Sequence, residues 1–179
     1  MKHFIVGLIL TYISVHSLVN LNSAYDYSLP GASDSSEIHL SSCTGKKVLI
    51  VSIATGSDHV SQLSALEQLQ QQYADSLIVI AAPSNSFGNE QLTDSAIVAF
   101  VSENYNATYL ISGKVQIAGN EIHPLFQWLS QKTLNGVLNN PIVEDFQKFL
   151  IDENGNLIGI FSASVEPLSN EIQDAIKGI

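Results

Sequence analysis

Basic residues are scarce in this chain of 179 residues. Lysine and arginine together number 7, against 17 aspartates and glutamates, and the net charge is −10. Such a chain repels phosphate backbones and has no basic stripe that could release counterions from a nucleic acid. We therefore expect no nucleic-acid partner.

Cysteine is nearly absent, which excludes a disulfide framework. Cys43 is the single cysteine, so an intramolecular disulfide cannot form. It lies in a turn-like segment, residues 41–45, with Lys46 and Lys47 as the nearby cations. Neither a helix N-terminus nor a neighbouring histidine is evident that could activate the thiol. We predict an inert packing or turn position, with a lone redox-active thiol as the alternative.

A hydrophobic run long enough to cross a membrane is also missing, and the nearest approach to one is at the N-terminus. Met1-Lys2-His3 is a short basic start, residues 4–13 are mainly apolar, and small and polar residues follow up to Ala24. This order is typical of a secretory signal peptide. We predict a signal peptide at residues 1–24, cleavage near Ser23 or Ala24, and export to the periplasm or the extracellular space.

The length of this apolar run also predicts whether the chain inserts into a membrane. It is shorter than the roughly 20 apolar residues that span a bilayer, so we expect no stable insertion after cleavage. Because the run extends weakly as far as Leu18, an uncleaved membrane anchor is one alternative. A buried N-terminal strand or helix is another.

Residues 25–179 are expected to form one domain. The chain is 45% apolar and 13% charged, and its length allows one well-buried core but not two ordinary domains. Residues 47–53 and 77–82 are continuous apolar runs, which predicts two central parallel strands. Apolar residues at helical spacing lie between them, with Ser57 or Asp58 as the N-cap. Strand, helix and strand then make a right-handed crossover.

Later segments continue this alternation. A second helix is predicted within residues 93–106, and a helix at residues 169–177 closes the chain. Between them, residues 147–161 form an antiparallel hairpin around Asn154-Gly155, a pair that suits a tight turn with positive backbone angles. Residues 133–143 show no periodic pattern. The order predicts an α/β, thioredoxin-like fold with a central mixed β-sheet flanked by helices.

Four segments with matching order and spacing point to a family. They are Gly45-Lys46-Lys47-Val48-Leu49-Ile50-Val51, Pro83-Ser84-Asn85-Ser86-Phe87-Gly88-Asn89-Glu90, Gly119-Asn120-Glu121-Ile122-His123-Pro124-Leu125-Phe126 and Phe146-Gln147-Lys148-Phe149-Leu150-Ile151-Asp152. Through them the chain resembles the glutathione peroxidase family over nearly all of residues 25–176. The short spacing between Trp128 and Phe146 is similar to the compact subtype, which implies a monomer.

The resemblance implies thiol-dependent reduction of hydroperoxides by a selenocysteine or cysteine, assisted by Gln, Trp and Asn, with no cofactor. Here the nucleophile position falls on Ser57, or on Gly56 when counted backward from the helix. The Gln, Trp and Asn positions are Ser86, Glu144 and Asp145, in that order. The resolving cysteine of thioredoxin-dependent relatives corresponds to Ser84. Because all of these catalytic positions are substituted, we assign no catalytic residue.

The substitutions change the expected chemistry. Peroxide reduction passes through a sulfenic or selenenic acid, and a serine oxygen cannot form one. We predict a pseudoenzyme that is retained for binding, for assembly with a partner, or for no strongly selected role. The alternatives are an atypical peroxidase that uses Cys43, with a small thiol and a peroxide as ligands, and a different activity in the former pocket.

Two other readings of the nucleophile region are weaker. Ser57, Asp58 and His59 are the residue types of a hydrolase triad, but sequence neighbours point apart instead of converging. Asp58, His59, Glu144 and Asp145 could supply oxygen and imidazole ligands to a metal. Because no recognised ligand spacing accompanies them, we predict no metal site and interpret them as a solvated acidic patch.

Overall fold

The structure, a computed structural model, describes residues 22–32 and 36–179. A five-stranded mixed sheet lies at its centre, in the order β5-β4-β3-β6-β7. β3 pairs in parallel with β4 and antiparallel with β6, as the predicted thioredoxin-like fold requires. The five strands are β3 (Lys47–Ile53), β4 (Leu77–Pro83), β5 (Leu110–Ile111), β6 (Lys148–Ile151) and β7 (Leu157–Phe161).

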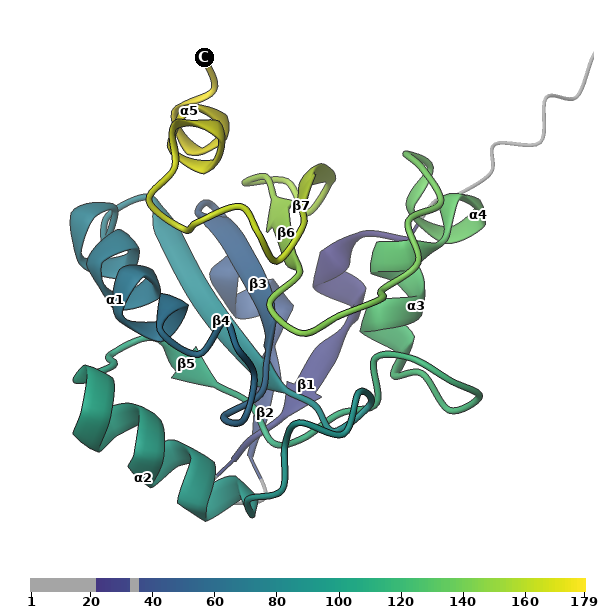
Figure 1. Cartoon of the computed structure of the whole chain (residues 1–179). Coiled ribbons are helices and arrows are strands. Elements are labelled where there is room, and N and C mark those ends of the chain that lie inside the picture. The colour runs from purple at the N-terminus through teal and green to yellow at the C-terminus, as the bar shows by residue number, and fades with distance from the viewer. Residues whose placement is uncertain (1–21, 33–35) are drawn as a thin grey trace, which may run out of the picture.

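Helices cover both faces of this sheet (Figure 1). On one face lie α1 (Gln62–Gln72), α2 (Asp94–Tyr105) and α5 (Asn170–Lys177). The other face carries α3 (Pro124–Ser130), followed by α4 (Lys132–Asn135), together with the short strands β1 (Ser28–Pro30) and β2 (Glu37–His39) and the 3-10 helices η1 (Ala24–Asp26) and η2 (Leu40–Cys43). Among the described residues, no helix has the length and apolar character needed to cross a membrane.

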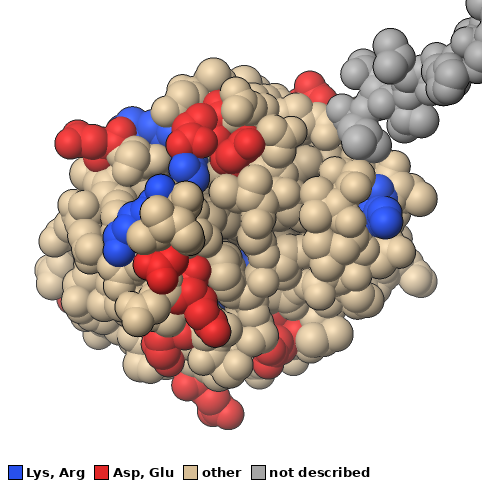
Figure 2. Space-filling view, turned by 90° about the horizontal axis from the view of Figure 1, so that it is seen from above, with Lys and Arg blue, Asp and Glu red and all other residues tan. Residues whose placement is uncertain are grey.

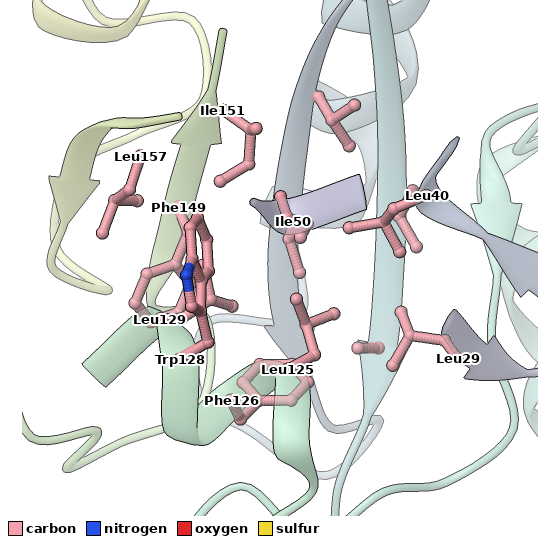
Figure 3. Packing of buried hydrophobic residues seen from close by; sticks show 14 of the residues in the cluster. Leu29, Leu40, Ile50, Leu125, Phe126, Trp128, Leu129, Phe149, Ile151 and Leu157 are labelled. Atoms are coloured by element: carbon pink, nitrogen blue, oxygen red, sulfur yellow. The ribbon is translucent and has the colours of Figure 1, made fainter. Parts of the chain in front are cut away.

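Alternating side chains of β3 divide the core into two clusters. Val48 and Ile50 pack toward α3, where Phe126 and Trp128 are almost fully buried (Figure 3). Leu49 and its odd-numbered neighbours pack toward α1, α2 and α5. Because β3 is buried on both faces, nearly all of its residues are apolar, which explains the continuous apolar run in the sequence.

The start of α1 differs from the prediction. The helix begins at Gln62 after Ser61, so the expected N-cap at Ser57 or Asp58 is wrong. The Ser57 hydroxyl instead accepts the backbone N–H of His59 at 3.3 Å, closing a local turn that precedes the helix. A serine can satisfy a backbone donor two residues on in this way, and here that turn replaces a helical cap.

The hairpin between β6 and β7 is present, but its turn is wider than predicted. Gly155 has a φ of +85°, while Asn154 is not in the left-handed region. The Asp152 carboxylate accepts the backbone N–H groups of Asn154 and Asn156 at 2.9 and 2.8 Å, which holds a longer loop. A side chain at Gly155 would clash with Ser23 and Tyr25, so glycine is needed here for close approach as well as for its φ.

Asn22, Ser23 and Ala24, next to the predicted cleavage site, make contacts with the folded domain. Residues 1–21 of the expected signal peptide are outside the described residues. Ser23 caps η1, Ala24 is fully buried, and the Trp128 indole donates to the Asn22 carbonyl at 2.7 Å. The packed domain therefore includes Asn22 to Ala24.

Acidic and basic side chains mix on one end of the molecule. In the view of Figure 2, most of the basic side chains lie beside acidic ones instead of forming a separate patch. Lys47 and Glu153 form an ion pair, with 2.6 Å between Nζ and Oε1.

Candidate functional site

Three chain segments meet in a pocket at the carboxyl end of the parallel strands β3 and β4. The loop after β3 contributes Ser57 to His59, the loop after β4 contributes Phe87 and Asn89, and the segment before β6 contributes Val143 to Asp145. The cavity measures about 280 Å³. Because β6 runs antiparallel to β3, its start lies at the same sheet edge as the end of β3.

Ser57, not Gly56, presents a side chain to this pocket. A Cβ on Gly56 would lie 2.7 Å from the backbone oxygen of Asn89, which is closer than real contacts allow. The Gly56 N–H donates to that same oxygen at 3.0 Å, so the two loops touch through their backbones. Of the two counts for the nucleophile position, the structure therefore leaves room for a side chain only at Ser57.

Ser84 and Ser86 do not line this pocket. Ser84 is fully buried and its hydroxyl donates to Ser86 Oγ at 2.9 Å. Ser86 Oγ in turn donates to Gln116 Oε1 at 2.8 Å and accepts the N–H of Ile117 at 3.0 Å. The structure thus brings Ser57, Glu144 and Asp145 together, while Ser86 joins the loop after β5 through its hydroxyl. That loop was not associated with the site from sequence.

Asp145 is the most unusual ionisable group in the pocket. It is 3% exposed, and Asn89 Nδ2 donates to its Oδ2 at 2.8 Å. Its Oδ1 has no hydrogen-bond partner among the described residues. Burial raises the pKa of this carboxyl, and the charges of Glu90 and Glu144 raise it further, against the Asn89 hydrogen bond and His59.

The backbone after Asp145 is held in a conformation that a bulky residue rarely adopts. Phe146 is fully buried with a φ of +62°. Its N–H donates to the Ser52 carbonyl at 2.6 Å, and its own carbonyl accepts from Lys148 Nζ at 2.9 Å. Such conformations persist where surrounding contacts over-determine them. The two bonds therefore fix where Glu144 and Asp145 enter the pocket.

Lys148 and Gln62 do not line the pocket but donate hydrogen bonds to backbone carbonyls of the segments around it, and sequence reasoning missed both. Lys148 is fully buried, and its Nζ also donates to the carbonyls of Ser162 and Ala163 at 3.4 and 3.3 Å. Burial lowers its pKa to about 8, opposed by the charges of Glu166 and Glu144. Gln62 Nε2 donates to the Ala163 carbonyl at 2.8 Å. A lysine within an apolar strand run was the available signal for Lys148; Gln62 gave none.

Glu144 and His59 complete the surroundings of the pocket. The Ala163 N–H donates to Glu144 Oε1 at 3.3 Å, which ties the segment after β7 to the pocket rim. His59 Nδ1 lies 3.5 Å from Gln62 Nε2, and its ring packs 6.2 Å from that of Phe146. The four residues considered as metal ligands, Asp58, His59, Glu144 and Asp145, all line this one cavity. Even so, within the described part of the chain no group of three or more His, Cys, Asp and Glu side chains could hold a metal ion.

Cys43 lies far from this pocket. It is 2% exposed at the end of η2, and burial raises the pKa of its thiol. Cys43 precedes β3 and Ser57 follows it, and a strand of seven residues rises by roughly 20 Å. The thiol and the pocket are therefore at opposite ends of the central strand.

Comparisons with known proteins agree with the fold and with the family that the sequence resembles. The family profile described as glutathione peroxidase matches residues 24–130. A glutathione peroxidase of Lactococcus lactis subsp. cremoris is 34% identical over 142 residues, which are 78% of this chain and 88% of the relative. A glutathione peroxidase-like peroxiredoxin of Schizosaccharomyces pombe is 32% identical over 152 residues, 82% of this chain and 95% of the relative.

Solved structures are also similar to this chain. Trgpx in its apo form has a TM-score of 0.64 and 29% identity, and the match covers 87% of this chain and 96% of that one. T. cruzi GPX1 has a TM-score of 0.61 at 22% identity, with 87% and 97% covered, and supports the fold alone. The predicted resemblance and the thioredoxin-like fold are both confirmed, and the chain belongs to the glutathione peroxidase family.

Proposed function

We propose that this chain is an exported member of the glutathione peroxidase family that does not reduce hydroperoxides and uses the former active-site pocket for binding. One observation carries the proposal: the residue that presents its side chain at the nucleophile position is Ser57, an alcohol. Peroxide reduction by this family needs a chalcogen that can be oxidised and then reduced by a thiol. An alcohol oxygen cannot complete that cycle.

The surroundings of Ser57 support the same conclusion. A reactive thiolate requires an electropositive setting, such as a helix N-terminus or neighbouring cations. Here α1 begins five residues after Ser57, at Gln62, and carboxylates line the pocket. The pocket has thus lost the charge environment of a peroxidase as well as its sulfur. It remains a cavity, which favours binding over a purely structural remnant.

The burial and position of Cys43 argue against the alternative peroxidase. A thiol that is 2% exposed, with a raised pKa, supplies little thiolate and admits no peroxide without a local opening. The second candidate function, an atypical peroxidase that uses a small thiol and Cys43, therefore has no supporting observation.

Turnover assays test this proposal directly. Consumption of hydrogen peroxide and of a lipid hydroperoxide is measured with glutathione and with thioredoxin, for the wild type, Ser57→Ala and Cys43→Ser. We expect rates equal to the protein-free background for all three. Robust turnover lost in Ser57→Ala would overturn the proposal, and turnover lost in Cys43→Ser would establish the alternative.

Export is a proposal that rests on the N-terminal sequence. Because Asn22 to Ala24 belong to the packed domain, we propose that cleavage leaves these residues on the mature chain. Mass spectrometry of the chain recovered outside the cytoplasm tests this, and a retained apolar segment in the membrane fraction would favour the uncleaved anchor. We also expect the mature chain to sediment as a monomer.

A further inference from the structure

The segment between α2 and β5 carries a motif for covalent modification. Asn106-Ala107-Thr108 is the single Asn-x-Ser/Thr sequence of the chain, and its middle residue is not proline. This pattern is the acceptor sequence for N-linked glycosylation, a modification that exported proteins carry in surface loops. Because so short a pattern also arises by chance, the structural setting of Asn106 decides whether it can serve as an acceptor.

Asn106 has the setting of an acceptor. Residues 106–108 belong to no helix or strand, and Asn106 is exposed. Its backbone N–H donates to the Ser102 carbonyl at 3.0 Å, which closes α2. Its side-chain amide, in contrast, has no hydrogen-bond partner within residues 22–32 and 36–179. A bulky substituent on this amide therefore displaces no contact of the fold.

The backbone conformation at Asn106 accounts for an asparagine but not for its free amide. Asn106 is the C-cap of α2 and lies in the left-handed region, with a φ of +51°. Glycine is the least strained residue in that conformation, and asparagine is tolerated there. The cap uses only the backbone N–H, so Asn106→Gly preserves the cap and removes the acceptor amide.

The contacts of Thr108 indicate when the motif is available. Its Oγ1 donates to Glu67 Oε1 at 2.8 Å, and its backbone N–H donates to Glu67 Oε2 at 2.6 Å. The hydroxyl that the motif requires is thus bound to α1 in the folded chain. We therefore expect the glycan to be attached during export, before this segment folds.

A glycan on Asn106 would leave the pocket beside Ser57 open. β4 and β5 are parallel and α2 connects them, so α2 leads from the carboxyl end of β4 back to the amino end of β5 (Figure 1). Its 12 residues rise by roughly 18 Å. Asn106 thus lies at the sheet edge opposite the pocket. The glycan would add hydrophilic bulk near the edge strand β5, whose Leu110 is 42% exposed.

We infer that Asn106 accepts an N-linked oligosaccharide during export. The inference rests on the export part of the proposed function, because the transferase acts on chains that cross a membrane. The donor is an oligosaccharide joined to a lipid diphosphate. The bond between its C1 and the diphosphate oxygen breaks, and a bond forms between C1 and Asn106 Nδ2. One amide proton passes to a base of the transferase, and the lipid diphosphate is the leaving group.

Cell-free translation of the full chain with microsomal membranes tests this inference. Import is measured as protection from added protease, and glycosylation as a gel mobility shift of one glycan that peptide-N-glycosidase reverses. We expect the imported wild type to carry the glycan. Asn106→Gly and Thr108→Val should abolish the shift, while Thr108→Ser should retain it. Asn120→Gln, which changes an exposed asparagine outside the motif, should leave the shift unchanged.

Three results would overturn the inference. A protected wild-type chain without a glycan would refute it and leave the proposed export standing. A shift that persists in Asn106→Gly would refute the assignment to this residue. A chain that stays accessible to protease and unmodified would refute export and the inference together.

Discussion

Placing a thiol at position 57 is expected to give a poor peroxidase, because the pocket now opposes thiolate formation. Ser57→Cys restores the missing sulfur at the only one of the two counted positions where a side chain fits. The change is nearly isosteric. If the missing sulfur were the only cause of inactivity, Ser57→Cys would restore peroxide turnover. Because carboxylates line the pocket, we expect little turnover from this variant.

The magnitude follows from the charges around Ser57. A thiol with an unperturbed pKa near 8.5 is roughly 3% ionised at pH 7. A carboxylate across a pocket of this size disfavours the thiolate by roughly 0.5 to 2 kcal/mol at an effective dielectric constant between about 20 and 80. Three carboxylates line the cavity, and none of its lining residues is a lysine or an arginine. We therefore expect about 1% thiolate or less, against about 90% for a thiol activated to a pKa near 6.

The assay measures the introduced thiol and its chemistry separately. In a Cys43→Ser background, the alkylation rate with iodoacetamide between pH 5 and pH 10 gives the thiol pKa, and peroxide consumption gives turnover. Adding Glu144→Gln and Asp145→Asn should lower the pKa and raise the alkylation rate at pH 7 several-fold, while adding Asp75→Asn should change neither. A thiol pKa below about 7 in the single Ser57→Cys variant would refute the electrostatic reasoning.

Three further predictions concern stability. Asp145→Asn should raise the free energy of unfolding by about 1–3 kcal/mol at pH 7. Because the folded-state pKa of this carboxyl is raised, wild-type stability is penalised as pH rises through it, so the gain should vanish in denaturant titrations at pH 4. Gly56→Ala should destabilise by about 1–3 kcal/mol in a thermal melt, since its Cβ would meet the Asn89 carbonyl at 2.7 Å. Lys148→Met should destabilise by about 1–3 kcal/mol because backbone carbonyls lose their donor. With a folded pKa of about 8 for Lys148 against 10.5 unfolded, the wild type should gain stability over this variant as pH rises from 8 to 10.5, and a flat difference would contradict this.

The elements with strong local signals could be predicted from the sequence. The strand at Lys47–Ile53, the helix capped by Thr93 and the final helix after Ser169 lie where the patterns indicate. Each combines a continuous or periodic apolar pattern with a defined end. The four-residue helix at Lys132–Asn135 was missed because one turn is too short to show a period.

The site could be predicted only in part. Ser57, Glu144 and Asp145 meet as the resemblance implies, because they flank strands that end at one sheet edge. The turn before α1 and the hydrogen bonds of Ser86 depend on which backbone groups tertiary packing brings near. No sequence spacing encodes such contacts.

Backbone hydrogen bonds join the loops that form the pocket. The Gly56 N–H to Asn89 carbonyl bond joins two of its loops, and the Phe146 N–H to Ser52 carbonyl bond fixes the third segment. All these groups are backbone, so these two bonds do not require particular side chains at positions 57, 144 and 145. Side chains on such a frame can be exchanged at little cost to these backbone bonds, and we expect Asp145 to lower stability at neutral pH because burial raises the pKa of its carboxyl. A residue that lowers stability inside an open pocket is the kind that a binding function retains.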